Sequence, residues 1–268
     1  MAVPQLLPTV KQTERVGNLT YHIEGELVPV LQVELDAGGI YFEHHILLWK
    51  DSDVDVEIKP LQGMARRMLA GLPLIMIEAK GSGRIAFSRD GAGHVFPLHL
   101  QSGQRVEVRE HQFLAATNNL VYSFSRIKGL ANMLLGNSGL FIDTFKNDGS
   151  QEAVLWLHGY GNVFELTLQS GESIDIEPGG WIYKEDTVRM DTTFQRLSAG
   201  LFGSAAQLCW NRFTGPGRIA FQSMSQSLDN GGSRPGAGKR PAPFLALVAM
   251  GIMFLAMALG LLLLVSKR

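Results

Sequence analysis

The sequence predicts an all-β domain built from three similar units, followed by a single C-terminal transmembrane helix. Three observations lead to this prediction. Apolar residues alternate with polar ones in residues 20–224, segments of this region recur at regular spacings, and residues 244–265 contain no charged side chain. A period of two is typical of strands that bury one face, whereas a helix repeats about every 3.6 residues.

Residues 1–19 form an N-terminal extension. It contains early prolines and lacks both a long apolar run and a small-residue cleavage site. These features are unlike a secretory signal or an Arg-rich transit peptide. We therefore expect the domain that follows to remain in the cytoplasm.

The clearest alternation lies in residues 163–168 and 173–176. Apolar side chains occupy every second position in both stretches, and a turn at Gly171 separates them. Two alternating runs joined by a short Gly-containing turn are typical of a β-hairpin. We predict that these two strands pair with each other.

Two pairs of similar segments reveal the internal repetition. Gly91–Val108 resembles Gly159–Ile176 without any gap, and both contain the triplet Gln-Ser-Gly. Gly81–Ser88 resembles Gly215–Gln222 at an offset of 134 residues, about twice the offset of 68 between the first pair, and an intermediate copy is visible at Gly136–Gly159. A weaker first copy of the Gln-Ser-Gly element is visible at Leu31–Glu43. The chain is therefore interpreted as three copies of one unit.

The predicted units span about residues 20–88, 89–158 and 159–224. A repeat of about 67 residues exceeds one solenoid coil and suits a small β-sandwich or barrel, so we expect three units around a pseudo-three-fold axis. Each unit also contains a stretch that predicts a short connecting helix: Leu61–Gly71, Ile127–Asn137 and Phe194–Ser204.

Several glycines lie between the predicted strands. We expect structural turns at six of them: Gly81, Gly83, Gly103, Gly171, Gly215 and Gly217. Glycine tolerates positive φ, which tight turns often require. None of the Gly-x-Gly pairs continues into a dinucleotide-binding or phosphate-binding loop, so these residues indicate no nucleotide cofactor.

The charge and the cysteine content argue against nucleic-acid binding and against a disulfide-stabilised fold. Five of the 24 basic residues and one of the 25 acidic residues lie from Ser225 onward, which leaves residues 1–224 with a formal net charge of −5. An acidic domain is poorly suited to binding nucleic acid. The single Cys209 excludes an intrachain disulfide and fits a reducing compartment, where we expect it to serve in packing.

The residues show no catalytic or metal-binding pattern. His44 and His45 are adjacent and would point to opposite faces of a strand, so they cannot chelate one ion together. His94, His99 and His111 have no histidine at the corresponding positions of the third unit. We therefore predict no enzyme activity, no metal site and no cofactor. The four tryptophans are expected to pack in the core or at strand edges, with a peptide groove as the alternative.

The C-terminal region predicts a tether. Residues 225–243 are rich in Gly, Pro and Ser and form a flexible linker, and 266–268 form a basic tail. The apolar stretch 244–265 would make a helix of roughly 33 Å, which matches a hydrocarbon core of roughly 30 Å. Ala256 and Gly260 form a small-xxx-small pair that would let two such helices associate.

Residues Leu168–Trp181 and Arg196–Phe221 carry a resemblance to a known family. They show a short helix-like run ending in Gly, an apolar strand, a Phe-x-Gly-x-Gly element and a Pro-Gly-Gly hairpin. This pattern, over about residues 20–224, resembles the altered-inheritance-of-mitochondria (Aim-twenty-four type) family of bacteria and mitochondria. The resemblance implies the β architecture of the tryptophan RNA-binding attenuator repeated three times, a role in membrane organisation and no catalytic motif. The anchor departs from the usual soluble bacterial pattern.

The leading functional hypothesis is a non-enzymatic scaffold or adaptor that is tethered to a membrane and recruits or organises a protein partner. The alternative is a small-molecule or lipid-binding module with a pocket at the pseudo-three-fold axis. RNA binding would rest on fold analogy alone, and the acidic charge opposes it. We expect a single-pass protein of the bacterial inner membrane, with a mitochondrial membrane as the alternative, and the sequence also allows a homo-oligomer.

Overall fold

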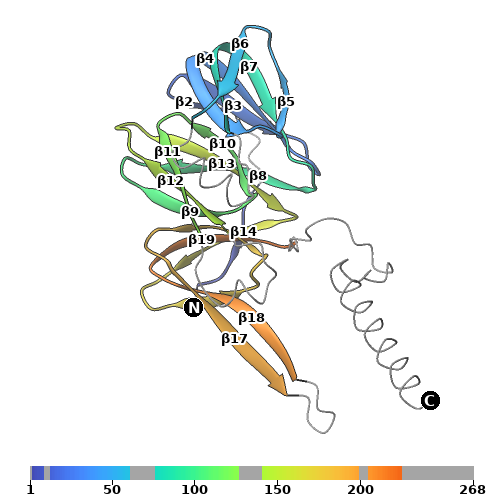
Figure 1. The fold of residues 1–268 in the computed structure, drawn as a ribbon, viewed down its shortest axis with the longest axis vertical. Helices are drawn as coiled ribbons and strands as arrows, with labels where there is room; N and C mark the ends of the chain where they lie inside the picture. The colour runs from blue at the N-terminus through green and yellow to red at the C-terminus, as the bar shows by residue number, and fades with distance from the viewer. Residues whose placement is uncertain (1, 9–12, 61–75, 127–140, 199–204, 225–268) are drawn as a thin grey trace, which may run out of the picture. The chain divides into compact units, whose positions relative to one another are not determined.

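The computed structural model describes residues 2–8, 13–60, 76–126, 141–198 and 205–224, which form β-strands and contain no helix (Figure 1). The all-β prediction is confirmed for this part of the chain. In chain order the strands are β1 Gln5–Leu6, β2 Glu14–Val16, β3 Leu19–Glu24, β4 Val30–Glu43, β5 Leu47–Lys50, β6 Val54–Ile58, β7 Met76–Phe87, β8 Gly93–Leu100, β9 Arg105–Arg109, β10 Phe113–Thr117, β11 Leu120–Arg126, β12 Phe141–Asn147, β13 Ala153–Tyr160, β14 Val163–Leu168, β15 Ser173–Ile176, β16 Trp181–Glu185, β17 Arg189–Ser198, β18 Ala205–Thr214 and β19 Gly217–Gln222.

One predicted connecting helix is wrong where the structure describes it. Residues 194–198 of the predicted helix Phe194–Ser204 continue β17, which pairs with β18 as far as Ser198 opposite Ala205. Thr192, Thr193 and Phe194 favour a strand, since β-branched and aromatic side chains pack well on a pleated surface. The other two predicted helices lie outside the described residues.

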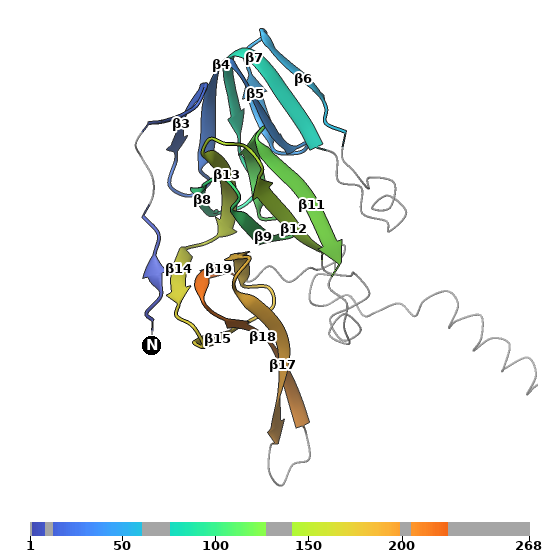
Figure 2. The same ribbon diagram turned by 90° about the vertical axis from the view of Figure 1, so that its left-hand side faces the viewer.

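The strands form three sheets (Figures 1 and 2). The seven-stranded sheet has the order β1-β14-β19-β16-β9-β12-β11. The nine-stranded sheet has the order β2-β3-β4-β10-β13-β8, and β7 joins it by pairing with β4, β5 and β6. The three-stranded sheet has the order β15-β18-β17. All the strand pairs are antiparallel.

The predicted hairpin of residues 163–168 and 173–176 is not formed. Both strands exist as β14 and β15, but β14 pairs with β1 and β19, whereas β15 pairs with β18 in a different sheet. A tight turn, closed by the Glu172 amide donating to the Gln169 carbonyl at 3.0 Å, connects the two sheets. The alternating apolar residues therefore face each other across a sandwich instead of lying side by side.

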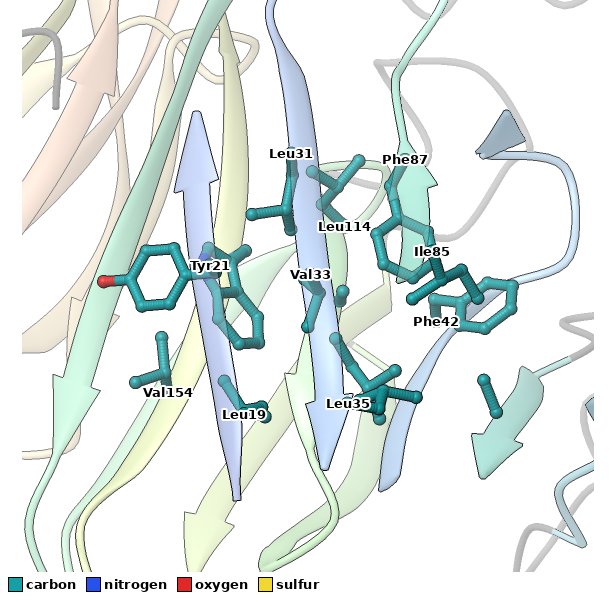
Figure 3. Packing of buried hydrophobic residues seen from close by; sticks show 14 of the residues in the cluster. Leu19, Tyr21, Leu31, Val33, Leu35, Phe42, Ile85, Phe87, Leu114 and Val154 are labelled. Atoms are coloured by element: carbon teal, nitrogen blue, oxygen red, sulfur yellow. The ribbon is translucent and has the colours of Figure 1, made fainter. Parts of the chain in front are cut away.

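Three clusters of buried apolar residues form the cores, and the strand residues of the first cluster all belong to the nine-stranded sheet. The first core includes Tyr21, Leu31, Phe42 and Phe87 (Figure 3). The second includes Phe113 and Phe145, whose ring centroids are 4.8 Å apart. The third lies between β14, β16 and β19 on one side and β15 and β18 on the other: Leu166, Leu168, Ile176, Trp181, Phe213 and Ile219 are among its members. Burial of these side chains is the main force that holds the layers together.

One irregularity in strand pairing occurs three times. The register of β5 against β7 shifts between Leu47 and Trp49. That of β10 against β13 shifts between Phe113 and Ala115, and that of β16 against β19 shifts between Trp181 and Tyr183. At each shift one residue, Leu48, Leu114 or Ile182, has no partner in the facing strand, as in a β-bulge, which bends a strand and increases its twist.

Candidate protein-interaction surface

The predicted turn glycines fall into two groups. Gly103 lies between β8 and β9, Gly171 lies between β14 and β15, and both have φ of 80°. No atom lies within 4 Å of the position that a Cβ would take at either residue. Gly215 lies between β18 and β19, where a Cβ would come 2.4 Å from the carbonyl oxygen of Gln169. Gly217, with φ of 136°, is the first residue of β19.

Gly81 and Gly83 lie inside β7 and not between two strands. Their φ values are 115° and 141°, and they face the register shift between Leu35 and Gly38 of β4. The glycines thus allow one long strand to bend, which corrects the prediction of a turn at these positions. A pattern of Gly-x-Gly is compatible with both structures, because either one needs positive φ.

The predicted site residues of the membrane span, Ala256 and Gly260, lie outside the described residues. Within the described ranges, no helix is long and apolar enough to span a bilayer.

Two of the histidines lie close to a carboxylate. Nε2 of His45 is 3.4 Å from Oε2 of Glu43, and Nε2 of His99 is 3.4 Å from Oε2 of Glu14. In the part of the chain that the structure describes, no three His, Cys, Asp or Glu side chains gather as metal ligands would. Burial, and secondarily the charge of Glu177, raise the pKa of the Cys209 thiol, which disfavours the nucleophilic thiolate.

A buried ion pair stabilises the junction between β4 and β10. Arg89 donates from Nη2 to Oε2 of Glu43 at 3.0 Å and to the carbonyl of Phe113 at 2.7 Å. Nearby, burial and then the Arg89 charge lower the pKa of His158 to about 4. His158 is 1% exposed, so it is shielded from solvent and from a substrate. The contacts of Arg89 join Glu43 at the end of β4 to Phe113 of β10.

The surface hollows give little support to a small-molecule site. One of about 320 Å³ lies beside Gly38, Thr117 and Asn118, and another of about 190 Å³ lies beside Gly25 and His94. Sites for drug-sized ligands usually enclose roughly 300–1,000 Å³ and are lined mainly by apolar and aromatic side chains. The first hollow is lined largely by glycine and polar residues.

Exposed apolar residues occur on the outermost strand β6. Val56 and Ile58 are 40% and 63% exposed, and they alternate with the exposed residues Asp55 and Glu57. Among the described strands, β6 pairs only with β7, so no described strand lies along its other edge. We call Val56, Ile58 and the open edge of β6 the edge stripe. Such an edge is a template for adding a strand from another chain.

Two other outer strands resemble β6 in their pairing. Val56 of β6 lies opposite Ala79, Tyr122 of β11 opposite Phe145, and Met190 of β17 opposite Phe213. All three outer residues are apolar or aromatic, as are the residues that they face. The three outer strands share this pairing, but Tyr122 and Met190 pack against the second and third cores, whereas Val56 is exposed.

Sequence reasoning had not singled out Val56 or Ile58. The alternation from Val54 to Ile58 predicts a strand with one apolar face, but it does not distinguish a buried face from an exposed one. Val54 is fully buried, and the exposure of Val56 and Ile58 follows from the outer position of β6.

Comparisons with known proteins identify relatives of this fold. The family model described as Mitochondrial biogenesis AIM24 matches residues 21–224. A solved structure of protein SPYM3_0169 from Streptococcus pyogenes is similar with a TM-score of 0.57 and 19% sequence identity, covering 77% of this chain and 94% of that protein. No curated protein matches the chain. The solved structure supports the fold alone.

Proposed function

The chain belongs to the AIM24 family, and from this premise we propose that it is a non-enzymatic scaffold that holds protein partners at a membrane. The observation that carries the proposal is the edge stripe, where exposed Val56 and Ile58 border an open strand edge. The partner would add an extended segment to β6, with its backbone pairing to the edge and its apolar side chains contacting the stripe.

The three-unit organisation is part of this proposal. The shared bulge in β5, β10 and β16 and the matching pairs around β6, β11 and β17 support the three units that the repeated segments predict. Repeated outer strands would offer a partner more than one edge. Linked sites raise avidity without any new type of contact.

The charge pattern of β6 indicates which segments would fit. Asp55 and Glu57 point to the face opposite the stripe, and Oε1 of Glu57 is 2.7 Å from Nζ of Lys80. A segment with apolar residues at alternate positions and basic residues between them would complement both faces. Acidic segments would be disfavoured by like charges across the strand pair.

The proposal of a membrane tether is based on the amino-acid sequence. The apolar residues 244–265 would anchor the domain, and residues 225–243 would let it move above the bilayer. We propose a domain that faces the cytoplasm at the bacterial inner membrane, with a mitochondrial membrane as the alternative. Anchoring would raise the local concentration of the stripe near membrane-bound partners.

The experiment is affinity purification of the full-length protein from its native membrane in mild detergent, followed by mass spectrometry. It compares the original chain with the double variant Val56→Lys/Ile58→Lys. Lysines on an outer strand oppose strand addition, and both positions are exposed, so folding should be retained. We expect partners in fixed proportion with the original chain and their loss from the variant.

Leu27→Lys provides the matched control, because Leu27 is 71% exposed but lies between β3 and β4. Its partners should remain bound. Retention of the same partners by the double variant would refute the edge stripe as their site. A co-purifying lipid or metabolite without any protein would favour the binding-module alternative.

A further inference from the structure

Two strands, β5 in the first predicted unit and β15 in the third, have one edge with no described strand beside it. The strands that correspond to β5 in the other two units have a neighbour on both edges: β10 lies between β13 and β4, and β16 lies between β19 and β9. In contrast, β5 pairs only with β7, and β15 pairs only with β18, among the described residues. The first unit therefore offers β5 without a described partner strand on one edge, and the third unit offers β15 in the same way.

On the edge where β5 pairs with β7, its pairing matches that of β10 with β13 and of β16 with β19. Its bulge between Leu47 and Trp49 matches the bulges at Phe113/Ala115 and Trp181/Tyr183. The match assigns Leu48, Trp49 and Lys50 of β5 to Ile182, Tyr183 and Lys184 of β16. These pairs occupy the same positions relative to their bulges.

Burial differs sharply between the matched residues. Ile182 and Tyr183 are completely buried, as are Leu114 and Ala115 of β10. Leu48 is 56% exposed and Trp49 is 36% exposed. A strand lies on each edge of β10 and β16, and these residues of theirs also belong to the first and second cores. Leu48 and Trp49 lack a described strand on the corresponding edge and are exposed.

The strand β15 matches the neighbour that β5 lacks. It pairs with β18 as β9 pairs with β12: Ile174 lies opposite Phe213, and Val106 lies opposite Phe145. On its other side β9 pairs with β16, through Val106, Glu107 and Val108. The corresponding residues of β15 are Ile174, Asp175 and Ile176, and their outer edge is open within the described part of the chain.

We propose that copies of this chain join head to tail, with β5 of one copy adding to β15 of the next. The register of β16 on β9 places Trp49 opposite Ile176, Lys50 opposite Asp175 and Asp51 opposite Ile174. The partner is therefore a second copy of this chain. The inference adds a surface to the proposed scaffold but does not depend on what the edge stripe binds.

Charge complementarity supports this register. In the internal pair, Nζ of Lys184 is 2.9 Å from Oε2 of Glu107. The intermolecular pair would place Lys50 against Asp175, which preserves one cation and one carboxylate at the same positions. Asp175 already accepts two hydrogen bonds of 2.7 Å from Arg212, which hold the carboxylate in place on β15.

The contact is heterologous, because one copy contributes β5 and the other copy contributes β15. Such contacts form rings when the rotation closes and open filaments when it does not. Leu48 and Trp49 would be buried at every junction. The membrane would confine the copies to one plane and increase their rate of encounter.

The first experiment is disulfide cross-linking of the full-length protein in mild detergent, in a Cys209→Ser background. One batch carries Lys50→Cys and the other carries Asp175→Cys. Opposite residues in an antiparallel pair are close enough for a disulfide. We expect a covalent dimer only when the batches are mixed, and a ladder of larger species when both substitutions are in one chain.

Ser173→Cys replaces Asp175→Cys as the register control, since it is displaced along the same strand. Mixing it with Lys50→Cys should give much less dimer. Equal yields from the two mixtures would overturn the register, and the absence of any intermolecular product would overturn the head-to-tail contact.

The second experiment measures the association constant by sedimentation of the full-length protein in detergent. Lys50→Glu should weaken association roughly tenfold or more, because it places two carboxylates opposite each other. Combining it with Asp175→Lys should restore much of the loss. Association that ignores both substitutions but disappears with Gly260→Leu would assign self-association to the span and refute the proposal. Partner loss in Val56→Lys/Ile58→Lys remains a separate readout of the scaffold function.

Discussion

Lys184 lies opposite Glu107 in the centre of the seam between β16 and β9, and its Nζ is 2.9 Å from Oε2 of that carboxylate. The same ammonium donates to the carbonyl of Val188 at 2.8 Å. The Lys184 side chain is 7% exposed and that of Glu107 is 19% exposed. Three residue pairs form the register of this seam, and at its end Arg105 and Asp186 add a second ion pair of 3.1 Å.

Replacing Lys184 with methionine should destabilise the protein. The variant retains most of the side-chain volume but removes the nearer cation of Glu107, whose remaining cation, Arg105, lies 3.7 Å away. This loss should cost about 2 kcal/mol. Thermal unfolding should then begin several degrees lower. The control is Lys146→Met, because the ion pair of Lys146 with Asp148 is about half exposed and should contribute little. Equal effects of the two substitutions would contradict the assigned role of the seam.

Stability should decrease as the pH falls from 6.5 toward 4, partly because of His158. Burial lowers the pKa of His158 to about 4, so the folded protein keeps the imidazole neutral while the unfolded chain protonates it below its ordinary value of 6.5. The unfolded state therefore binds more protons in this window. Between pH 7.5 and pH 5 this residue should remove about 2 kcal/mol from the free energy of unfolding.

Urea unfolding at the two pH values tests the role of His158. His158→Gln should be less stable than the original chain at pH 7.5 but should lose about 2 kcal/mol less on acidification. His22→Gln is the control, because His22 lies on β3 with its side chain 34% exposed. Identical losses in His158→Gln and the original chain would show that other groups cause the pH dependence.

Alanine should be tolerated better at Gly171 than at Gly215. Gly171 has φ of 80° and open space around it, so alanine there should cost about 1–2 kcal/mol through backbone strain alone. At Gly215 the new Cβ would come 2.4 Å from a backbone oxygen, which must move, so the cost should be about 3 kcal/mol or more. Chemical unfolding of the two variants measures the difference. Similar costs at both positions would argue against the close packing of the β18–β19 turn on Gln169.

The full-length chain should remain in the membrane fraction after alkaline carbonate extraction. A chain that ends at Ser225 should be recovered in the supernatant, because it lacks the apolar residues 244–265. Immunoblotting of both fractions provides the measurement. Release of the full-length chain together with the shorter one would rule out the proposed transmembrane anchor.

The sequence predicted local strand structure well because alternation reports which side of a strand is apolar. Strands β14 and β15 were both expected, with Gly171 between them. Their pairing was not predictable, because a short turn can join two strands of one sheet or two facing sheets of a sandwich. The pairing of β14 with β19 depends on residues that are far away along the chain.

The interaction surfaces were less accessible to sequence analysis. Val54, Val56 and Ile58 look alike as sequence, yet only Val54 is buried. The open edges of β5 and β15 are likewise properties of the sheet order and not of their residues. The shared position of the bulges in β5 and β16 matches Leu48 with Ile182, and the two residues differ in burial.

The N-terminal strand β1 pairs with β14, so that Gln5 lies opposite Glu165 and the blue end of the chain runs beside β14 (Figure 2). The ribosome therefore releases β1 long before its partner strand has been made. During translation β1 cannot pair with β14 until residues 163–168 have been made, and we expect a pairing over such a distance to form late. A nascent chain that stalls before β14 should expose β1 to proteases, and its protection would report that synthesis has reached the third core.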